Sequence, residues 1–302
     1  MSLTTHQPKV GLVLGSGSAR GWAHIGVIRA LAEAGVVPDA ICGCSIGAFV
    51  GAVHADGDLA KLEDWVSGLA WQDVVSLLDV SLKGGFIKGA KLIQYFERNF
   101  VDRDFAQLPV PFACVATNLE TGREVWLREG SVAHAVRASI ALPGLFTPVA
   151  HEGGFLIDGG LVNPVPVSLC RAMGMDVVIA VDLNSDILGR HLQKAANERP
   201  EENEVSWTQR VLERFGVAPD TLALETGDSP SLVTVLATSI NIMQVRIGRS
   251  RMAGDPADVL IAPRLAHLGL MDFHRGAEGI AEGRAAVERS LPGILHALGR
   301  AP

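Results

Sequence analysis

The sequence predicts an α/β protein built on a mainly parallel sheet. Short apolar runs typical of buried strands recur along the chain, and segments with helical apolar spacing separate them. Residues 10–54 alternate strand, loop, helix, strand, turn and helix, which is a βαβ unit. Such a unit places its two strands parallel and joins them by a right-handed crossover. Both observations indicate a sheet with helices packed on it.

The expected elements begin with a buried strand at Val10–Leu14, which runs into a glycine-rich loop. A helix is expected over 22–34, because apolar residues recur there at positions i, i+3, i+4 and i+7, and Gly35 can cap it. A second short strand at 40–42 turns sharply into a small-residue helix at 48–54.

Residues 58–105 are expected to be mainly helical. The later elements are strands at 111–117, 124–127, 155–157, 176–182 and 259–262, and helices at 131–139, 165–173, 231–251 and 276–289. Residues 184–230 are polar and lack a clear period, which indicates an exposed insertion or mobile loop. Because strands recur on both sides of it, we expect one domain over 1–302, which residues 231–302 complete as helix, strand and helix.

Composition excludes several classes of protein. The 302 residues carry a formal net charge of −7 and no run rich in Lys and Arg, so a nucleic-acid partner is not expected. Four scattered cysteines in apolar stretches indicate reduced thiols and not a disulfide scaffold. The chain has neither a signal-peptide pattern at its start nor an apolar run of about 18 residues. We therefore expect a cytoplasmic protein whose contact with a membrane is peripheral.

The motif G-x-S-x-G occurs once between an expected strand and an expected helix, from Gly43 to Gly47 with Ser45 at its centre. A nucleophilic serine must protrude from a tight turn, and glycines two positions before and after it let the neighbouring backbone pass close. The helix that starts there points its N–H groups toward the site, where negative charge develops in acyl transfer. The turn therefore predicts Ser45 as a nucleophile.

A serine hydroxyl needs a base to become a nucleophile. His267 and His274 come late enough in the chain for a Ser-His-Asp triad, but neither lies in a glycine-framed loop. Asp158 ends the expected strand at 155–157 and precedes two glycines. Its carboxylate could act on Ser45 directly, and partial burial would make it a stronger base. An ordinary Asp-Gly turn is the alternative, and the residues alone leave these possibilities open.

The glycine-rich loop at 15–21 also has two interpretations. It matches the dinucleotide motif G-x-G-x-x-G only in part, because Arg20 stands where the third glycine belongs, and Asp39 precedes the next strand instead of ending it. The other interpretation is an oxyanion hole, in which backbone N–H groups stabilise a tetrahedral intermediate. A serine turn in the next strand–helix loop favours the oxyanion hole.

Four segments together resemble the patatin-like phospholipases, in the order and spacing of the bacterial branch of that family. They are residues 11–31, 43–52, 138–149 and 156–166. The resemblance covers about residues 9–183, which we expect to be the catalytic core. It implies a three-layer α/β/α fold. It also implies a serine hydrolase that cleaves lipid carboxylic esters, of phospholipase A or lysophospholipase type, through an acyl-serine and without metal or cofactor.

The resemblance assigns roles to individual residues. It implies Ser45 as nucleophile and Asp158 as general base, in a turn completed by Gly159 and Gly160. It implies an oxyanion hole from the backbone of Gly17 and Ser18, with Arg20 and Gly21 completing the loop. Ser16 and Ser18 interrupt the consecutive glycines usual in the family, and serine adopts positive φ less readily than glycine.

Three further expectations concern the surroundings of the site. The loop at 141–148 and the helices of 58–105 are candidate walls for an acyl chain, and plain core packing is the alternative. The individual candidates are Leu142, Leu145 and Phe146. Three arginines near a helix end, Arg246, Arg249 and Arg251, could meet anionic headgroups or form a solvated face. Cys44, beside Ser45, is expected to be a small packing residue. A lipid-binding or regulatory protein without turnover remains the non-enzymatic alternative.

Overall fold

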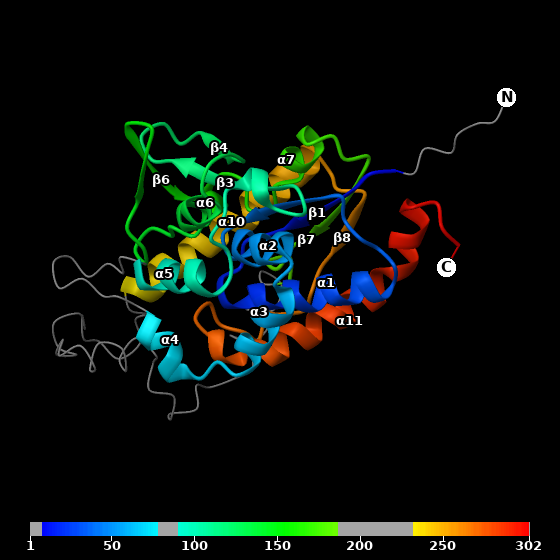
Figure 1. Cartoon of the computed structure of the whole chain (residues 1–302), viewed down its shortest axis with the longest axis horizontal. Coiled ribbons are helices and arrows are strands. Elements are labelled where there is room, and N and C mark those ends of the chain that lie inside the picture. Colours follow the sequence, from blue (N-terminus) through cyan, green and yellow to red (C-terminus); the bar gives the residue numbers. More distant parts are fainter. Residues whose placement is uncertain (1–7, 78–89, 187–231, 302) are drawn as a thin grey trace.

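The computed structural model describes residues 8–77, 90–186 and 232–301. Figure 1 shows a twisted sheet with helices on both of its faces. The strands are β1 (Val10–Leu14), β2 (Ala40–Cys44), β3 (Phe112–Asn118), β4 (Glu124–Leu127), β5 (Val149–His151), β6 (Gly154–Asp158), β7 (Val177–Val181) and β8 (Val259–Ile261). Their order is β5-β6-β3-β2-β1-β7-β8, and β4 pairs with β3.

The sheet is parallel in its centre and antiparallel at one edge. Strands β3, β2, β1, β7 and β8 all pair in parallel, as the βαβ pattern predicts. Strands β4 and β6 pair antiparallel with β3, and β5 pairs antiparallel with β6. The sheet is therefore mixed. β5 was not expected from the sequence, because three residues are too few for an alternating pattern to be recognised.

The longer helices are α1 (Ala23–Glu33), α2 (Ile46–Asp56), α3 (Leu59–Ser67), α4 (Trp71–Leu77), α5 (Ala90–Asn99), α6 (Val132–Ser139), α7 (Val167–Ala172), α10 (Leu232–Gly254) and α11 (Gly276–Ala297). Three-residue to five-residue 3-10 helices lie at η1 (Ser18–Trp22), η2 (Phe105–Gln107), η3 (Gly159–Leu161) and η5 (Phe273–Arg275). Ser131 caps α6 by accepting a hydrogen bond from the backbone N–H of His134.

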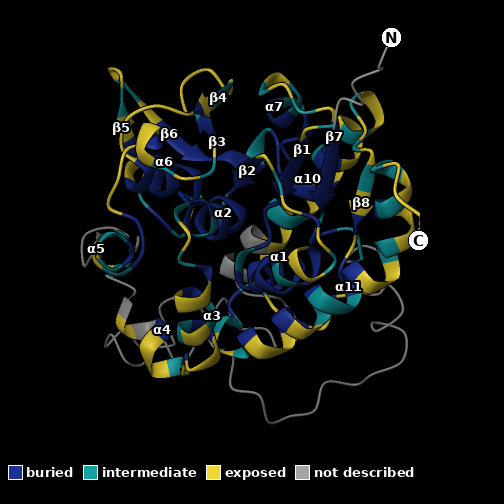
Figure 2. Cartoon of the chain, turned by 45° about the vertical axis from the view of Figure 1, so that its right-hand side comes forward, coloured by how far each residue is buried: buried dark blue, intermediate teal, exposed yellow. Residues whose placement is uncertain are grey.

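Two apolar cores lie on opposite faces of the sheet. Leu12 and Leu14 of β1 pack into one core with residues of α1, α2 and α11. Val13, between them, points to the other face and packs into a smaller core with residues of α7, such as Leu169. Met252 of α10 packs against this second core. The central strands β1, β2, β3 and β7 are buried between the two helical layers (Figure 2), which confirms the three-layer α/β/α fold.

Helices α1 and α11 lie side by side, although they come from opposite ends of the chain (Figure 1). A Cβ atom added to Gly26 of α1 would lie 1.9 Å from the carbonyl oxygen of Ile280, and one added to Gly283 of α11 would lie 2.0 Å from that of Ala23. The two backbones can therefore approach this closely only because glycine stands at both contacts.

Helix α11 continues past the end at residue 289 that the sequence predicts, through Pro292 to Ala297. Proline inside a helix leaves one carbonyl without a helical partner, here that of Glu288. Both Pro292 and Glu288 are exposed, so water can satisfy that carbonyl.

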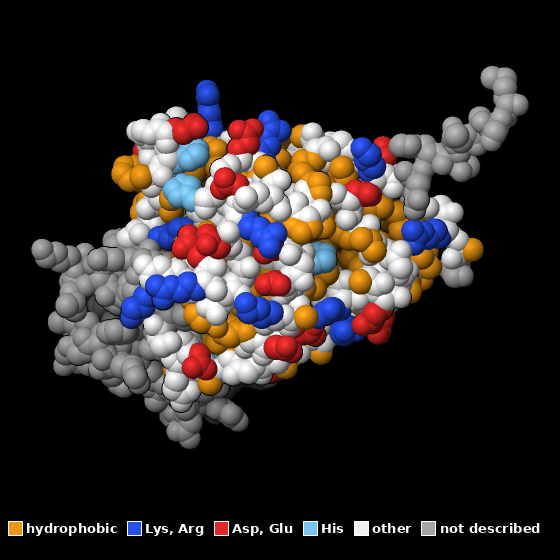
Figure 3. Space-filling model, viewed as in Figure 1, with side chains coloured by type: hydrophobic (Ala, Val, Ile, Leu, Met, Phe, Trp, Pro, Cys, Tyr) orange, Lys and Arg blue, Asp and Glu red, His pale blue; other side chains and the backbone are white. Residues whose placement is uncertain are grey.

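Within the described part of the chain, every helix is too short or too polar to cross a bilayer. Most of the insertion expected at 184–230 lies outside the described residues. Basic and acidic side chains are interspersed on the face shown in Figure 3, as the modest net charge suggests.

Candidate active site

Strands β2 and β6 meet end to end on the same edge of β3. Cys44 of β2 pairs with Val115 of β3, and Asp158 of β6 pairs with the next residue, Ala116. The other edge of β3 is taken by β4, which pairs with both Val115 and Ala116. Because β2 runs parallel to β3 and β6 runs antiparallel, their C-terminal ends point toward each other. This brings Ser45, the residue after β2, next to Asp158, 113 positions away in the chain.

Ser45 occupies a strained turn between β2 and α2. Its φ of 55° and ψ of −123° lie in a region that residues other than glycine rarely adopt. A Cβ atom on Gly43 would lie 2.5 Å from the Cα of Ala48, and one on Gly47 would lie 2.1 Å from the carbonyl oxygen of Leu14. Both glycines of the G-x-S-x-G motif are therefore required by close backbone contacts.

The hydroxyl of Ser45 donates a hydrogen bond to the carboxylate of Asp158, with 2.7 Å between Oγ and Oδ2. The other carboxylate oxygen, Oδ1, accepts a hydrogen bond from the N–H of Gly160 at 2.7 Å. Asp158 is fully buried, and this burial raises its pKa to about 6, against the lowering effect of its two hydrogen bonds. A carboxylate with this pKa is charged at neutral pH and basic enough to accept a proton.

Ser139, at the end of α6, fixes the serine turn through two hydrogen bonds of its hydroxyl group. Its buried hydroxyl accepts a hydrogen bond from the N–H of Ser45 at 2.8 Å and donates one to the carbonyl of Val115 at 2.7 Å. The turn is thereby tied to the same residue of β3 that pairs with Cys44. The sequence prediction missed Ser139, which lies inside the segment 138–149 that carries the family resemblance.

The glycine-rich loop after β1 leaves two adjacent N–H groups free. The flanking N–H groups donate to carbonyls: Gly15 to Val181, Ser16 to Pro164, Ala19 to Leu270 and Arg20 to Gly17. In the described part of the chain, the N–H groups of Gly17 and Ser18 have no partner. Ser18 adopts a φ of 53°, and its hydroxyl donates to the carbonyl of Leu270 at 2.6 Å. A serine is thus held in the conformation that glycine adopts more readily.

Arg20 and Gly21 support this loop from inside. Arg20 is buried, its Nε donates to the carbonyl of Gly17 at 3.2 Å, and its burial lowers its pKa to about 10. A Cβ atom on Gly21 would lie 2.2 Å from the side chain of Ile46, so glycine is needed where η1 packs on α2. Of the predicted oxyanion residues, Gly17 and Ser18 present free N–H groups, whereas the N–H of Arg20 is bonded to the carbonyl of Gly17.

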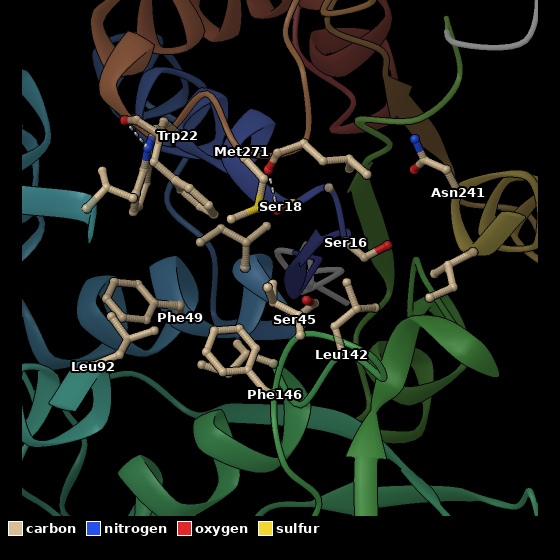
Figure 4. A pocket seen from close by; sticks show the side chains of 18 of the residues that line it. Ser16, Ser18, Trp22, Ser45, Phe49, Leu92, Leu142, Phe146, Asn241 and Met271 are labelled. Atoms are coloured by element: carbon tan, nitrogen blue, oxygen red, sulfur yellow. Dashed lines mark hydrogen bonds between the residues drawn. The ribbon is translucent and has the colours of Figure 1, made fainter. Parts of the chain in front are cut away.

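A cavity of about 110 Å³ opens over Ser45, Gly17 and Ser18. Figure 4 shows Ser16, Ser18 and Ser45 around the same opening, with aromatic and aliphatic side chains extending away from them. The three predicted wall residues, Leu142, Leu145 and Phe146, all line this cavity. Aromatic residues from four other segments also line it: Trp22, Phe49, Trp65 and Phe273. Of these, only Trp65 lies in a region predicted to form a wall, the helices of 58–105.

The histidine candidates lie elsewhere. His267 is exposed, with its Nε2 3.7 Å from Glu278, and His274 packs edge-on against Trp71. Neither histidine is among the described residues that line the cavity. The carboxylate of Asp158 therefore occupies the position beside Ser45 that a triad histidine would take.

The other interpretations also find no support. Asp39 accepts a hydrogen bond from the N–H of Val10 at 2.7 Å, so it lies at the start of β1, at the opposite end from the glycine-rich loop. An acid that binds the ribose of a dinucleotide would have to lie at the loop end. Among the described residues, no group of three or more His, Cys, Asp or Glu could hold a metal ion.

Two other predictions concern the three arginines of α10 and the cysteine beside Ser45. Arg251 forms an ion pair with Glu124 at 3.0 Å and donates to the carbonyl of Val162, so it is engaged with the protein. Arg246 and Arg249 are exposed on α10. Cys44 is buried, and this burial raises the pKa of its thiol well above the ordinary value, as expected of a packing residue.

Comparisons with known proteins agree with this geometry. A family model described as patatin-like phospholipase matches residues 12–171. An uncharacterized NTE family protein of Mycobacterium tuberculosis is 34% identical over 329 residues, which cover 94% of this chain and 91% of that protein. Lysophospholipase nte1 of Emericella nidulans is 37% identical over 183 residues, covering 58% of this chain and 12% of the fungal protein. VipD from Legionella pneumophila shares the fold, with a TM-score of 0.54 at 16% identity over 95% of this chain and 67% of VipD.

Proposed function

Because the chain belongs to the patatin-like phospholipase family of lipid ester hydrolases, we propose that Ser45 and Asp158 form its catalytic dyad. The reaction is hydrolysis of a carboxylic ester in a phospholipid or lysophospholipid, through an acyl-serine intermediate. The observation that carries this proposal is the 2.7 Å hydrogen bond from Ser45 Oγ to the buried carboxylate, beside two free N–H groups and an apolar cavity.

The first half of the reaction transfers the acyl group to the enzyme. Asp158 accepts the hydroxyl proton as Ser45 Oγ attacks the ester carbonyl carbon. The carbonyl oxygen becomes negatively charged and receives hydrogen bonds from the N–H groups of Gly17 and Ser18. The protonated Asp158 then gives its proton to the departing alcohol oxygen, which leaves the acyl group bound to Ser45.

The second half releases the fatty acid. Asp158 takes a proton from a water molecule, the resulting hydroxide attacks the acyl-serine, and the same two N–H groups stabilise the second oxyanion. Asp158 returns the proton to Ser45 Oγ as the bond to the acyl group breaks. The acyl chain lies meanwhile against the apolar cavity wall, which includes Leu142 and Phe146.

Labelling with a fluorophosphonate, followed by peptide mapping, tests the nucleophile, and hydrolysis of a lysophospholipid and of a nitrophenyl ester tests both residues. We expect label on Ser45 alone and a loss of activity of at least about 1000-fold in Ser45→Ala and Asp158→Asn. Ser290→Ala is the matched control, because that hydroxyl donates to Ala286 within α11.

Other outcomes would point elsewhere. Activity that survives in both dyad variants contradicts the proposal. Loss of activity in His267→Ala or His274→Ala, with Asp158→Asn unaffected, would indicate a histidine triad. Tight lipid binding by the wild-type protein without release of fatty acid would indicate a binding protein.

A further inference from the structure

The two N–H groups proposed to bind the oxyanion belong to two consecutive peptide groups. The carbonyl of each peptide group accepts a hydrogen bond from a buried side chain. The N–H of Gly17 shares a peptide group with the carbonyl of Ser16, and that carbonyl accepts a hydrogen bond from Asn184 Nδ2 at 3.0 Å. The N–H of Ser18 shares a peptide group with the carbonyl of Gly17, which accepts from Arg20 Nε at 3.2 Å. Asn184 and Arg20 are each 2% exposed.

Fixing the carbonyl of a peptide group also fixes its N–H. The peptide group is planar and trans, so its N–H points in the opposite direction to its carbonyl. A hydrogen bond to the carbonyl also polarises the peptide group and makes its N–H a better donor. Each of the two buried donors therefore acts on the free N–H group of a residue that lines the cavity, without touching the substrate itself.

We infer that Asn184 is a positioning residue for the Gly17 N–H, in the way that Arg20 is for the Ser18 N–H. This inference rests on the proposed function, because it assigns a role to the support of the proposed oxyanion hole. Neither side chain is among the described residues that line the cavity. Asn184 would therefore affect the reaction only through the orientation of the loop, whereas Arg20 also donates to Asn241, which lines the cavity.

The segment after β7 is placed to give this support. β7 pairs in parallel with β1, and Leu14 pairs with Val181, so the C-terminal ends of the two strands lie side by side. The side chain of Leu183 then lies under Gly17, where an added Cβ would approach its Cδ1 to 2.6 Å. The backbone N–H of Asn184 donates to Asp182 Oδ1 at 2.9 Å. This hydrogen bond fixes the backbone of Asn184 and so limits where its side-chain amide can lie.

Burial raises the pKa of the Asp182 carboxyl. The hydrogen bond from the Asn184 N–H and the positive charges of Arg249 and Arg20 counteract that rise. Asn241 of α10 accepts a hydrogen bond from Arg20 Nη2 at 3.2 Å. The orientation of the Asn184 amide follows from its neighbour, since the opposite orientation would set Oδ1 against the Ser16 carbonyl oxygen.

Steady-state kinetics of Asn184→Ala and Arg20→Lys test the inference, with Asn184→Asp alongside as a variant of equal size that lacks the donor. Removing a whole oxyanion donor lowers kcat by about 100-fold to 1000-fold, and a misaligned donor should lower it by about 10-fold to 100-fold. We expect a fall of that size in kcat, with KM within about threefold of the wild-type value, because the interaction strengthens only in the transition state.

A second measurement separates positioning from a general loss of structure. A trifluoromethyl ketone lipid analogue forms a tetrahedral adduct with the serine and carries the oxyanion, whereas the corresponding alcohol does not. We expect the variants to bind the ketone more weakly by the same factor as kcat falls, and to bind the alcohol as the wild type does. The control is Asn163→Ala, which removes another buried amide whose Nδ2 donates to Glu124 and Ser168. It should keep kcat.

Two results would overturn the inference: wild-type kcat in folded Asn184→Ala or Asn184→Asp, or an equal loss of affinity for ketone and alcohol. The failure of the dyad proposal would look different, because Ser45→Ala would then keep its activity and the ketone would bind it as well as it binds the wild type.

Discussion

At the scale of single residues, the burial of Asp158 determines the pH range in which the proposed dyad is active. The carboxylate must be unprotonated to accept the serine proton, and its pKa is raised to about 6. Burial lowers the pKa of His24 and of His54 to about 4, so neither histidine titrates in this range. An inflection near pH 6 is therefore expected from Asp158.

The first prediction is the pH profile of acylation. The rate of fluorophosphonate labelling, and kcat/KM for a nitrophenyl ester, should rise as the pH increases through about 6 and then level off. The residual labelling of Asp158→Asn should lack this inflection. An inflection that persists in Asp158→Asn and disappears on removal of a histidine would contradict the assignment.

The second prediction concerns stability, since the same burial destabilises the fold. The pKa of Asp158 is raised in the folded protein from 3.8 to about 6, so the folded state binds the proton more tightly than the unfolded chain does. This contribution to stability is present at about pH 4, is lost as the pH rises to about 6, and corresponds to about 3 kcal/mol. Asp158→Asn, which carries no charge, should therefore be more stable than the wild type at pH 8.

Urea denaturation of both proteins at pH 4.5 and pH 8 checks this prediction. The difference in the free energy of unfolding should be large at pH 8 and small at pH 4.5. An inactive variant that is less stable than the wild type at pH 8 would show that the carboxylate's hydrogen bonds outweigh the penalty of its burial.

At the scale of helices and strands, local periodicity predicts most elements but not how they meet. The apolar runs predict strands at 40–42 and 155–157, and the structure extends them to β2, which ends at Cys44, and β6, which ends at Asp158. That both lie on one edge of β3, with their ends facing, depends on the register of pairing between distant segments, and a local pattern does not carry that information. The end of α11 was placed too early because Pro292 is normally a stop signal and here is tolerated at an exposed position.

The third prediction tests the contact between α1 and α11. Gly26→Ala and Gly283→Ala each place a methyl group about 2 Å from a backbone oxygen of the other helix, so the helices must move apart. Such overpacking lowers the free energy of unfolding by about 1 to 3 kcal/mol. Gly293→Ala is the matched control on α11, because its added Cβ meets nothing within 4 Å, and it should stabilise the protein by a few tenths of a kcal/mol or more.

The melting temperatures of the three variants test this prediction. The first two should melt at lower temperature than the wild type and the third at the same temperature or higher. Equal melting temperatures for all three would mean that the close helix contact does not limit stability.

At the scale of the whole molecule, the motif residues and part of the cavity wall could be predicted, and the rest of the cavity could not. Gly43 is required by a contact within the serine turn and Gly47 by its contact with Leu14 at the end of β1, and the G-x-S-x-G motif shows both glycines directly. Ser139 and Asn184 are single polar residues that become informative only when folding brings them under the site. Aromatic cavity residues such as Trp22 and Phe49 have the same sequence pattern as core residues, because a cavity wall is a part of the core with one side uncovered.

The fourth prediction follows from the assembly of that cavity from distant segments. Leu92 of α5 lines it on the far side of Phe49 from Ser45, as Figure 4 shows. A larger side chain there should shorten the space for an acyl chain while leaving the serine, the carboxylate and the glycine-rich loop in place. Leu92→Trp is therefore expected to lower kcat/KM for a long-chain lysophospholipid ester by about 10-fold or more. A loss of that size follows when one or two methylene groups of the acyl chain can no longer be buried in the cavity.

The same variant should hydrolyse a nitrophenyl acetate or butyrate at the wild-type rate, because these acyl chains end before they reach Leu92. Leu260→Trp, at an exposed position on β8, adds the same side chain outside the cavity and should leave both activities unchanged. A series of esters of increasing chain length locates the effect, since the ratio of variant to wild-type kcat/KM should be near one for short chains and fall beyond a threshold length. A uniform loss at every length would mean that Leu92 supports the site and does not bound the chain.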